Sequence, residues 1–359
     1  MGETDQTGNQ KKKTKSALLL VNAICLAIGV CSGPMIMRLY FIHGGKRVWL
    51  SSWLESGGWP INFILLLLTY LHRRHKQGPS AAKLVFIGGR LFTGAAITGA
   101  LCGADYFLYA YGVSRLPIST SSLVAATQLV FASLFAFVLV KQKFTPYSIN
   151  AVVLLTVGAG VLALHTSGDR PGGESGKEYY MGFFMTVADA VLFGFMFPFM
   201  ELTYKKAGQA VTYTLVLEFQ LVMSFVATVV STIGMIVNND FEAIAREARD
   251  FGLGETTYFA VLVCSAVAWQ CAVLGSIGVT FDGSALLCAI IITVAFNATE
   301  ILGVILYGEK FTAEKGVAIV LASWGFFSYF YGELKHSTKE KNEIQSPEKD
   351  TPLPISVTI

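Results

Sequence analysis

The chain has 359 residues, of which 53% are hydrophobic and 14% are charged, and its formal net charge is +3. Average soluble domains carry about 25% charged residues, so a water-soluble domain of this composition would have too little charged surface to cover its apolar side chains. The small net charge gives no signal of nucleic-acid binding, which would need clustered Lys and Arg with interleaved aromatic residues.

Ten stretches of the chain are long and apolar enough to cross a bilayer as helices, which takes about 20 residues. In chain order they are residues 17–37, 49–70, 86–111, 118–140, 147–165, 180–202, 213–237, 257–277, 284–306 and 315–332. Lipid cannot hydrogen-bond to the backbone, so each span is expected to be helical. The prediction is an all-α, polytopic membrane protein with ten transmembrane helices.

Three segments outside these spans have distinct compositions. We expect residues 1–16 to form a cytosolic N-terminal tail and the glycine-rich residues 166–179 to form a flexible linker. Residues 333–359 are rich in Lys, Glu, Ser and Pro, a composition that predicts a disordered cytosolic tail.

Residues 240–251 carry a helical spacing of apolar residues between the seventh and eighth spans. Phe241, Ile244, Ala248 and Phe251 fall on one face of a helix. This pattern predicts an amphipathic helix lying at the membrane surface. A polar loop with chance periodicity is the alternative.

The positions of the basic residues predict the orientation of the chain. With the N-terminus in the cytosol, cytosolic segments hold sixteen Lys and Arg residues and the opposite side holds ten. Short cytosolic segments carry the excess of positive charge in membrane proteins. We therefore expect both termini in the cytosol.

The two halves of the chain resemble each other. Residues 143–145 and 310–312 both read Lys-Phe-Thr, after the fourth and the ninth span. The repeats would be residues 17–165 and 180–332, each with five spans. Because five is odd, the second repeat is inverted in the membrane, an arrangement typical of transporters. Chance similarity between two apolar stretches is the alternative.

Seven ionisable side chains lie inside the predicted spans, where a charge costs about 2.5–3.5 kcal/mol on insertion scales and usually serves a function. They are Glu55, Arg90, Asp105, Asp189, Glu201, Glu218 and Glu300. Asp105 could pair with a cationic substrate or carry a coupling proton. Alternatively, it could be a buried hydrogen-bonding residue that holds two helices together. Asp189 and Glu300 could face a water-filled cavity or could serve helix packing. Lys205 follows Glu201 at i+4, which favours an interfacial salt bridge there.

Amide and aromatic side chains inside the spans are candidates for binding a flat heterocycle. Gln128, Gln270 and Asn297 could hydrogen-bond to the edge of a base, or could join helices in an ordinary bundle. Trp269 and Tyr106 occupy matching positions in the two repeats, 163 residues apart. Their rings could sandwich a flat ligand, with plain packing as the alternative.

Pro34, Pro60 and Pro198 interrupt predicted spans, where they permit kinks and freed carbonyls like those of the broken helices in transporters. The sequence contains no phosphate-binding glycine loop and no His or Cys spacing typical of a metal site. We therefore expect no cofactor, no enzymatic activity and no transport driven by ATP hydrolysis on this chain.

Several motifs, in order along the chain, resemble the plant purine permease family of the drug/metabolite transporter superfamily. They are residues 44–47 (GGKR), 105–112 (DYFLYAYG), 116–123 (LPISTSSL), 141–146 (KQKFTP), 201–206 (ELTYKK) and 309–316 (EKFTAEKG). The resemblance covers about residues 21–334, which is nearly the whole chain.

The resemblance implies ten helices in two inverted halves and proton-coupled import of adenine, cytokinins, related bases or alkaloids at the plasma membrane. It places a central cavity among spans 1–4 and 6–9. We predict that Asp105, Tyr106, Gln128, Trp269, Gln270 and Asn297 bind substrate, and that Asp105, Glu300 and Asp189 are the candidates for proton coupling.

Three alternatives to this function stay open. A carrier of nucleotide sugars or phosphate esters would need basic residues deep in the spans, where only Arg90 is available, near an end. A membrane receptor or scaffold would need neither the repeat nor the acids inside the spans. A membrane enzyme would need a clustered acid, base or metal set, which the sequence does not contain.

The chain departs from the family pattern at three of the predicted site positions. Tyr106 stands where the family often has Asn, Asn297 where it usually has Pro, and Asp189 where it has a small apolar residue. The added acid and amide groups suggest the hypothesis that a basic alkaloid is preferred over a neutral purine.

Overall fold

The computed structural model describes residues 3–77, 85–125, 127–141, 145–164, 175–209, 212–282 and 285–345, and within these ranges the regular structure is entirely helical. The α-helices are α1 (Glu3–Ile42), α2 (Val48–Ser56), α3 (Trp59–Gln77), α4 (Gly89–Arg115), α5 (Ile118–Ala125), α6 (Gln128–Phe135), α7 (Pro146–Leu164), α8 (Gly176–Ala207), α9 (Tyr213–Val237), α10 (Asp240–Asp250), α11 (Glu255–Asp282), α12 (Ala285–Tyr307) and α13 (Ala313–Gln345). A π-helical segment, η1 (Ala136–Val140), continues α6.

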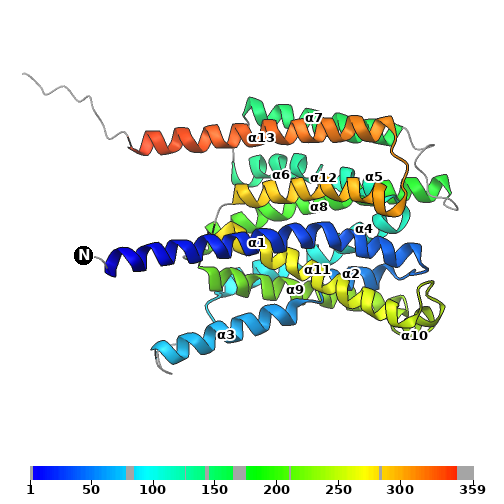
Figure 1. Ribbon diagram of the computed structural model, residues 1–359, viewed down its shortest axis with the longest axis horizontal. Coiled ribbons are helices and arrows are strands. Elements are labelled where there is room, and N and C mark those ends of the chain that lie inside the picture. Colours follow the sequence, from blue (N-terminus) through cyan, green and yellow to red (C-terminus); the bar gives the residue numbers. More distant parts are fainter. Residues whose placement is uncertain are drawn as a thin grey trace, which may run out of the picture.

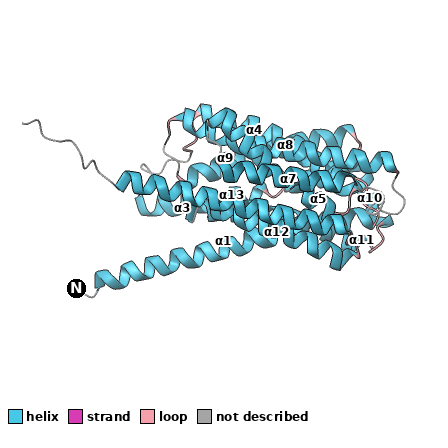
Figure 2. Ribbon diagram, turned by 90° about the horizontal axis from the view of Figure 1, so that it is seen from above, coloured by secondary structure: helices cyan, strands magenta, loops and turns pink. Residues whose placement is uncertain are grey.

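The long helices run side by side along the long axis of the molecule (Figure 1). Helices α7 and α13 pack against each other at one edge of the bundle, and α3 lies at the opposite edge. The N-terminal part of α1 projects away from the other helices (Figure 2). The most extensive pairings between helices join α1 to α11, α4 to α8, and α4 to α9.

All ten predicted spans coincide with helices, and six helical segments in the described part of the chain are long and apolar enough to cross a membrane. These are Ala17–Ile42, Gly89–Arg115, Thr120–Val140, Gly176–Ala207, Tyr213–Val237 and Glu255–Thr280. Large apolar side chains remain exposed along the outside of the bundle, for example Leu68 and Phe184. Such a surface suits lipid rather than water, so the protein is a multi-pass membrane protein.

Two of the predicted spans are broken into shorter helices. Residues 49–70 form α2 and α3, separated at Gly57 and Gly58, and Pro60 lies in the first turn of α3, where its missing N–H costs nothing. Residues 118–140 form α5, α6 and η1. Pro34 and Pro198 lie inside the continuous helices α1 and α8, so neither proline ends its helix.

The segments outside the spans are more helical than their composition predicts. Helix α1 begins at Glu3 and α13 continues to Gln345, so residues 333–345 are helical where we expected disorder to begin. Residues 346–359 and most of the linker, residues 165–174, lie outside the described part of the chain. Helix α8 begins with a capping box, in which Ser175 and Glu178 bond reciprocally to each other's backbone N–H groups.

Residues 240–250 form the helix predicted from their periodicity, but α10 packs against the bundle through only part of its predicted face. Ala248 and Phe251 are buried against Tyr40 and Tyr258, whereas Phe241 is exposed. Charged Arg and Asp residues elsewhere on α10 keep its other face polar. The helix therefore covers one end of α1, α2 and α11.

Polar contacts fasten α10 to the loop between α1 and α2. The Glu247 carboxylate accepts hydrogen bonds from the hydroxyls of Tyr40 and Tyr258 and from the Lys46 backbone N–H. Arg47 lies 3.4 Å from Asp240 and 3.7 Å from Glu247. Burial raises the pKa of the Asp240 carboxyl above its ordinary value, even though Arg47 favours the charged form.

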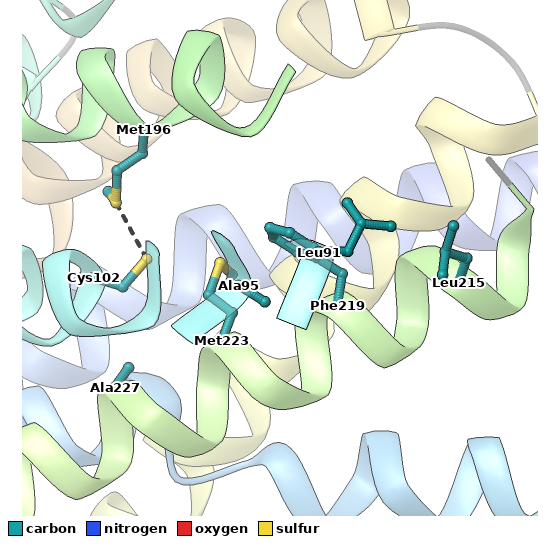
Figure 3. Packing of buried hydrophobic residues seen from close by; sticks show 8 residues of the cluster. All are labelled: Leu91, Ala95, Cys102, Met196, Leu215, Phe219, Met223 and Ala227. Carbon is teal, nitrogen blue, oxygen red and sulfur yellow. Dashed lines mark hydrogen bonds between the residues drawn. The ribbon is translucent and has the colours of Figure 1, made fainter. Parts of the chain in front are cut away.

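Helix α4 lies between α8 and α9 and forms the main apolar core with them. Figure 3 shows this cluster, in which α4 contributes Leu91, Ala95 and Cys102, α8 contributes Met196, and α9 contributes Leu215, Phe219, Met223 and Ala227. The Cys102 thiol lies 3.2 Å from the sulfur of Met196. This core fixes the position of α4, which carries the Asp105 motif.

Candidate functional site

Small residues bring α4 and α8 close together. A side chain at Gly94 or at Gly112 would collide with Thr203 or Thr186 of α8. Thr186 hydrogen-bonds to the Gly182 carbonyl of its own helix, so its polar group needs no partner from α4. Packing of small residues is the usual way in which membrane helices approach closely.

Three carboxyl groups meet where α4 and α8 pack together with α2. Glu55 of α2, Asp105 of α4 and Asp189 of α8 are all buried. The side chains of Asp105 and Asp189 lie within hydrogen-bonding reach of each other, and Glu55 interacts electrostatically with both. An ionised carboxylate can only accept hydrogen bonds. A hydrogen bond between Asp105 and Asp189 therefore requires that one of the two carries a proton.

The break between α2 and α3 places this cluster next to α11. A β-carbon at Gly58 would lie 2.7 Å from Oε1 of Gln270, so only glycine lets the chain pass α11 this closely. Glu55 lies in the last turn before the break, and Asn62 lies in the first turns after it. The broken helix thus presents an acid and an amide on the two sides of one short turn.

Two buried amides join α3 to α11. Nε2 of Gln270 donates a hydrogen bond of 2.7 Å to Oδ1 of Asn62, and both side chains are almost inaccessible to solvent. Nδ2 of Asn62 itself donates to no acceptor among the described residues.

The indole of Trp269, beside Gln270, packs edge-to-face against Tyr109, with ring centroids 5.8 Å apart. A β-carbon at Gly33 of α1 would lie 2.9 Å from this indole, so glycine makes room for it. The Nε1 of Trp269 is buried and has no hydrogen-bond partner within the described ranges. Tyr109 interacts electrostatically with Glu55 and Asp189, which puts the aromatic pair beside the carboxyl cluster.

Buried polar atoms without partners are the most informative feature of this region. Within the described structure they include two donors, Nδ2 of Asn62 and Nε1 of Trp269, and two acceptors, Oε1 of Glu55 and Oδ1 of Asp105. Leaving such a group unsatisfied costs about 1–3 kcal/mol, so proteins rarely keep several without a use for them. Together they could bind a ligand that offers both donors and acceptors.

The structure brings together four of the residues predicted from the sequence, namely Asp105, Asp189, Trp269 and Gln270. Tyr106 packs against the apolar core that contains Cys102 and Met196. The ring partner of Trp269 is Tyr109.

The remaining predicted residues are not joined to this group by the described contacts. Gln128 begins α6 and is half-buried, with its backbone close to Gly194 of α8. Glu300 is fully buried in α12. The side chain of Asn297 lies outside the described part of the structure.

Sequence reasoning gave no role to Glu55, Asn62 or Tyr109. Glu55 was recognisable as an acid inside an apolar span, but the sequence did not show which neighbouring helices its side chain would contact. Tyr109 lies one helical turn after Asp105, a spacing that puts both on one side of α4. Nothing in the sequence distinguishes Asn62 from an amide that joins two helices.

Two other acids near the predicted span ends make local contacts outside the carboxyl cluster. Glu201 forms the expected salt bridge with Lys205, at 2.7 Å. Glu218 accepts hydrogen bonds from the backbone N–H groups of Phe86 and Ile87, just ahead of α4. In the described part of the chain, no group of three or more His, Cys, Asp or Glu side chains is arranged to hold a metal ion.

Comparisons with known proteins agree along nearly the whole chain. A family model described as purine nucleobase transmembrane transport matches residues 17–339. Purine permease 3 of Arabidopsis thaliana is 51% identical over 333 residues, covering 92% of this chain and 95% of that protein. Purine permease 2 of the same plant is 47% identical over 341 residues, with the same coverage.

A solved protein structure matches 87% of this chain and 98% of its own, with a TM-score of 0.51 and 15% sequence identity. At this identity the match shows a shared overall fold and nothing more specific.

Proposed function

Because the chain belongs to the purine permease family, whose members are transporters and not enzymes, we propose that it carries purine nucleobases and related heterocycles through the polar region between α2, α3, α4, α8 and α11. The observation that carries the proposal is the set of buried donors and acceptors from four of these helices. A purine base offers acceptor ring nitrogens and donor N–H groups on one flat edge, which such a set can satisfy.

Proton coupling is proposed to depend on Asp105 and Asp189. Their hydrogen bond requires one shared proton, and the neighbouring Glu55 makes two simultaneous charges in the pair unfavourable. A site that holds one proton in this way could take it up on one side of the membrane and release it on the other. Glu300, which is also buried, is the second candidate for this role.

The proposed architecture has ten transmembrane helices in two inverted repeats. Under such a repeat, α1 corresponds to α8 and α4 corresponds to α11. The symmetry operation would then turn the pair α1–α11 into the pair α8–α4, and both pairs are present in the structure. It would turn α7 into α13, and these two helices pack against each other. This pattern supports a pseudo-twofold axis, around which the halves could rock to expose the site alternately.

We propose that both termini face the cytosol and that the protein lies in the plasma membrane. The distribution of Lys and Arg supports the orientation. Import driven by protons would then run from the acidic outer side to the cytosol.

The substrate range is proposed to include adenine, cytokinins and alkaloids with basic nitrogen atoms. Three buried carboxyl groups in one place could pair with a protonated nitrogen, since only one shared proton is required by their hydrogen bonding. A basic substrate would bring its own positive charge, whereas a neutral purine would leave the cluster to bind protons.

A carrier of phosphate esters is disfavoured by what the buried cations contact. Arg38 donates to the Val113 carbonyl at 2.9 Å, and Lys315 donates to the Lys310 carbonyl at 3.0 Å. Both are engaged near helix ends, away from the carboxyl cluster. A phosphate placed beside three carboxyl groups would be repelled.

Uptake of labelled adenine by yeast that lacks its own purine uptake tests the proposal. Entry should exceed that of cells with an empty vector, should be faster at pH 5 than at pH 7, and should fall when a protonophore is added. Uptake equal to that of the empty vector for adenine, a cytokinin and an alkaloid alike would refute the function. Uptake that ignores both pH and protonophore would refute the coupling alone.

A further inference from the structure

Asn62 is held in one orientation by the hydrogen bond from Gln270. The amide is fully buried, and the 2.7 Å bond from Nε2 of Gln270 occupies its Oδ1. Gly58 allows Gln270 to reach across the break between α2 and α3, because any side chain there would meet it. The chain therefore uses one buried amide and one glycine to fix another amide.

The unsatisfied polar atom of this amide is its donor. Oδ1 of Asn62 accepts the bond from Gln270, whereas Nδ2 has no acceptor among the described residues. Polar groups in protein interiors usually have hydrogen-bond partners for both their donors and their acceptors. In Asn62 the acceptor Oδ1 has a partner, whereas the donor Nδ2 has none among the described residues.

Other buried donors and acceptors lie in the same region as Nδ2 of Asn62. Trp269, next to Gln270 in the chain, offers a second buried donor without a partner, and the acids Glu55 and Asp105 offer the acceptors. Helix α11 packs against both α2 and α3, so the donors come from elements that touch the acid-bearing α2. A ligand for this region must therefore supply acceptors toward Asn62 and Trp269.

We propose that Asn62, positioned by Gln270, donates its Nδ2 hydrogen bond to an unprotonated ring nitrogen of the purine and is thereby a specificity-determining residue of the carrier. The inference rests on the proposed function, since it names a residue of the same site. It predicts that the carrier distinguishes a purine from an analogue in which that nitrogen is replaced by C–H. Such a replacement leaves ring size and shape almost unchanged and removes only the acceptor.

The test uses adenine and its 1-deaza, 3-deaza and 7-deaza analogues as competitors of labelled adenine uptake. For the wild type, at least one analogue should compete about tenfold or more weakly than adenine, as expected for one lost hydrogen bond to a buried donor. In Asn62→Ala, adenine itself should weaken by a similar factor, and the same analogue should compete as well as adenine. Gln270→Leu should reduce the discrimination, because Asn62 is then no longer fixed.

Controls separate this effect from a general loss of protein. Asn150→Ala removes a surface amide that bonds to Ser328 at 2.9 Å on the α7–α13 edge, and it should keep the wild-type ratios. Asn62→Ser, compared at equal amounts of protein in the membrane, replaces Asn62→Ala if the alanine variant does not accumulate.

Three results have distinct meanings. Discrimination that disappears in the Asn62 variants supports the inference. A wild type that treats all three analogues as adenine, or Asn62 variants that keep the wild-type ratios, overturns it while leaving the transport function standing. A wild type with no adenine, cytokinin or alkaloid uptake overturns the proposed function itself.

Discussion

Replacing Asp189 by asparagine should uncouple transport from protons while keeping the local structure. An asparagine amide can donate to the Asp105 carboxylate, so the hydrogen bond between α4 and α8 survives. The variant no longer needs a proton in that bond. We therefore expect it to move substrate down its own gradient without accumulating it.

The expected size of the effect follows from the single proton in the Asp105–Asp189 bond. An inward gradient of two pH units supplies about 2.7 kcal/mol per proton when the membrane potential is zero. One coupled proton can therefore drive accumulation of a neutral base by about a hundredfold. Asp189→Asn should instead bring the inside and outside concentrations to a ratio near one.

Proteoliposomes with a clamped potential and an imposed pH gradient allow this measurement. Labelled adenine should accumulate in vesicles with the wild type, and with the control Glu201→Gln, whose surface salt bridge lies outside the site. Asp189→Asn and Asp105→Asn should only equilibrate. If both variants accumulate adenine to the wild-type ratio, the shared proton is not the coupling proton and the reasoning fails.

Three further predictions concern the scaffold. Gly275→Ala should destabilise the protein by about 1–3 kcal/mol, because its β-carbon would lie 2.5 Å from a backbone atom of α1. Gly160→Ala should not, because its β-carbon would meet no atom within 4 Å, and equal unfolding of both variants in detergent would contradict this. Glu218→Ala should cost about 1.5–3 kcal/mol, since it removes charged acceptors for two backbone N–H groups ahead of α4, and an unchanged melting temperature would count against that role. Because burial raises the pKa of Asp240, the folded state binds this proton more tightly than the unfolded chain, and stability should fall as pH rises from the ordinary value of 3.8 through the raised pKa. Asp240→Asn should flatten that part of the curve of melting temperature against pH, and an identical curve would refute it.

The positions of the helices could be predicted from the sequence because the bilayer imposes one requirement on every span. A run of about 20 apolar residues must be helical in lipid, and each of the ten predicted runs is helical over most of its described residues, two of them with a break. Pro60 marked residues 49–70 as a span that could be broken. The break lies just before Pro60, at Gly57 and Gly58, which are turn signals themselves.

The membership of the site was only partly predictable, because it depends on which face of each helix meets which neighbour. Asp105 and Asp189 were recognisable as acids in apolar spans, but their contact depends on close packing of α4 and α8 at small residues far apart in sequence. The repeat paired Trp269 with Tyr106 by position. In the structure Tyr106 packs against the apolar core, and Tyr109 contacts the indole instead.

Equilibrium binding of labelled adenine to the purified protein tests the central claim most directly. Trp269→Phe removes one unpartnered donor while keeping an aromatic ring, and Glu55→Leu removes one unpartnered acceptor. Each should weaken binding about tenfold or more, while Glu201→Gln binds as the wild type does. Wild-type affinity in both site variants would contradict a purine site at the junction of α2, α4 and α11.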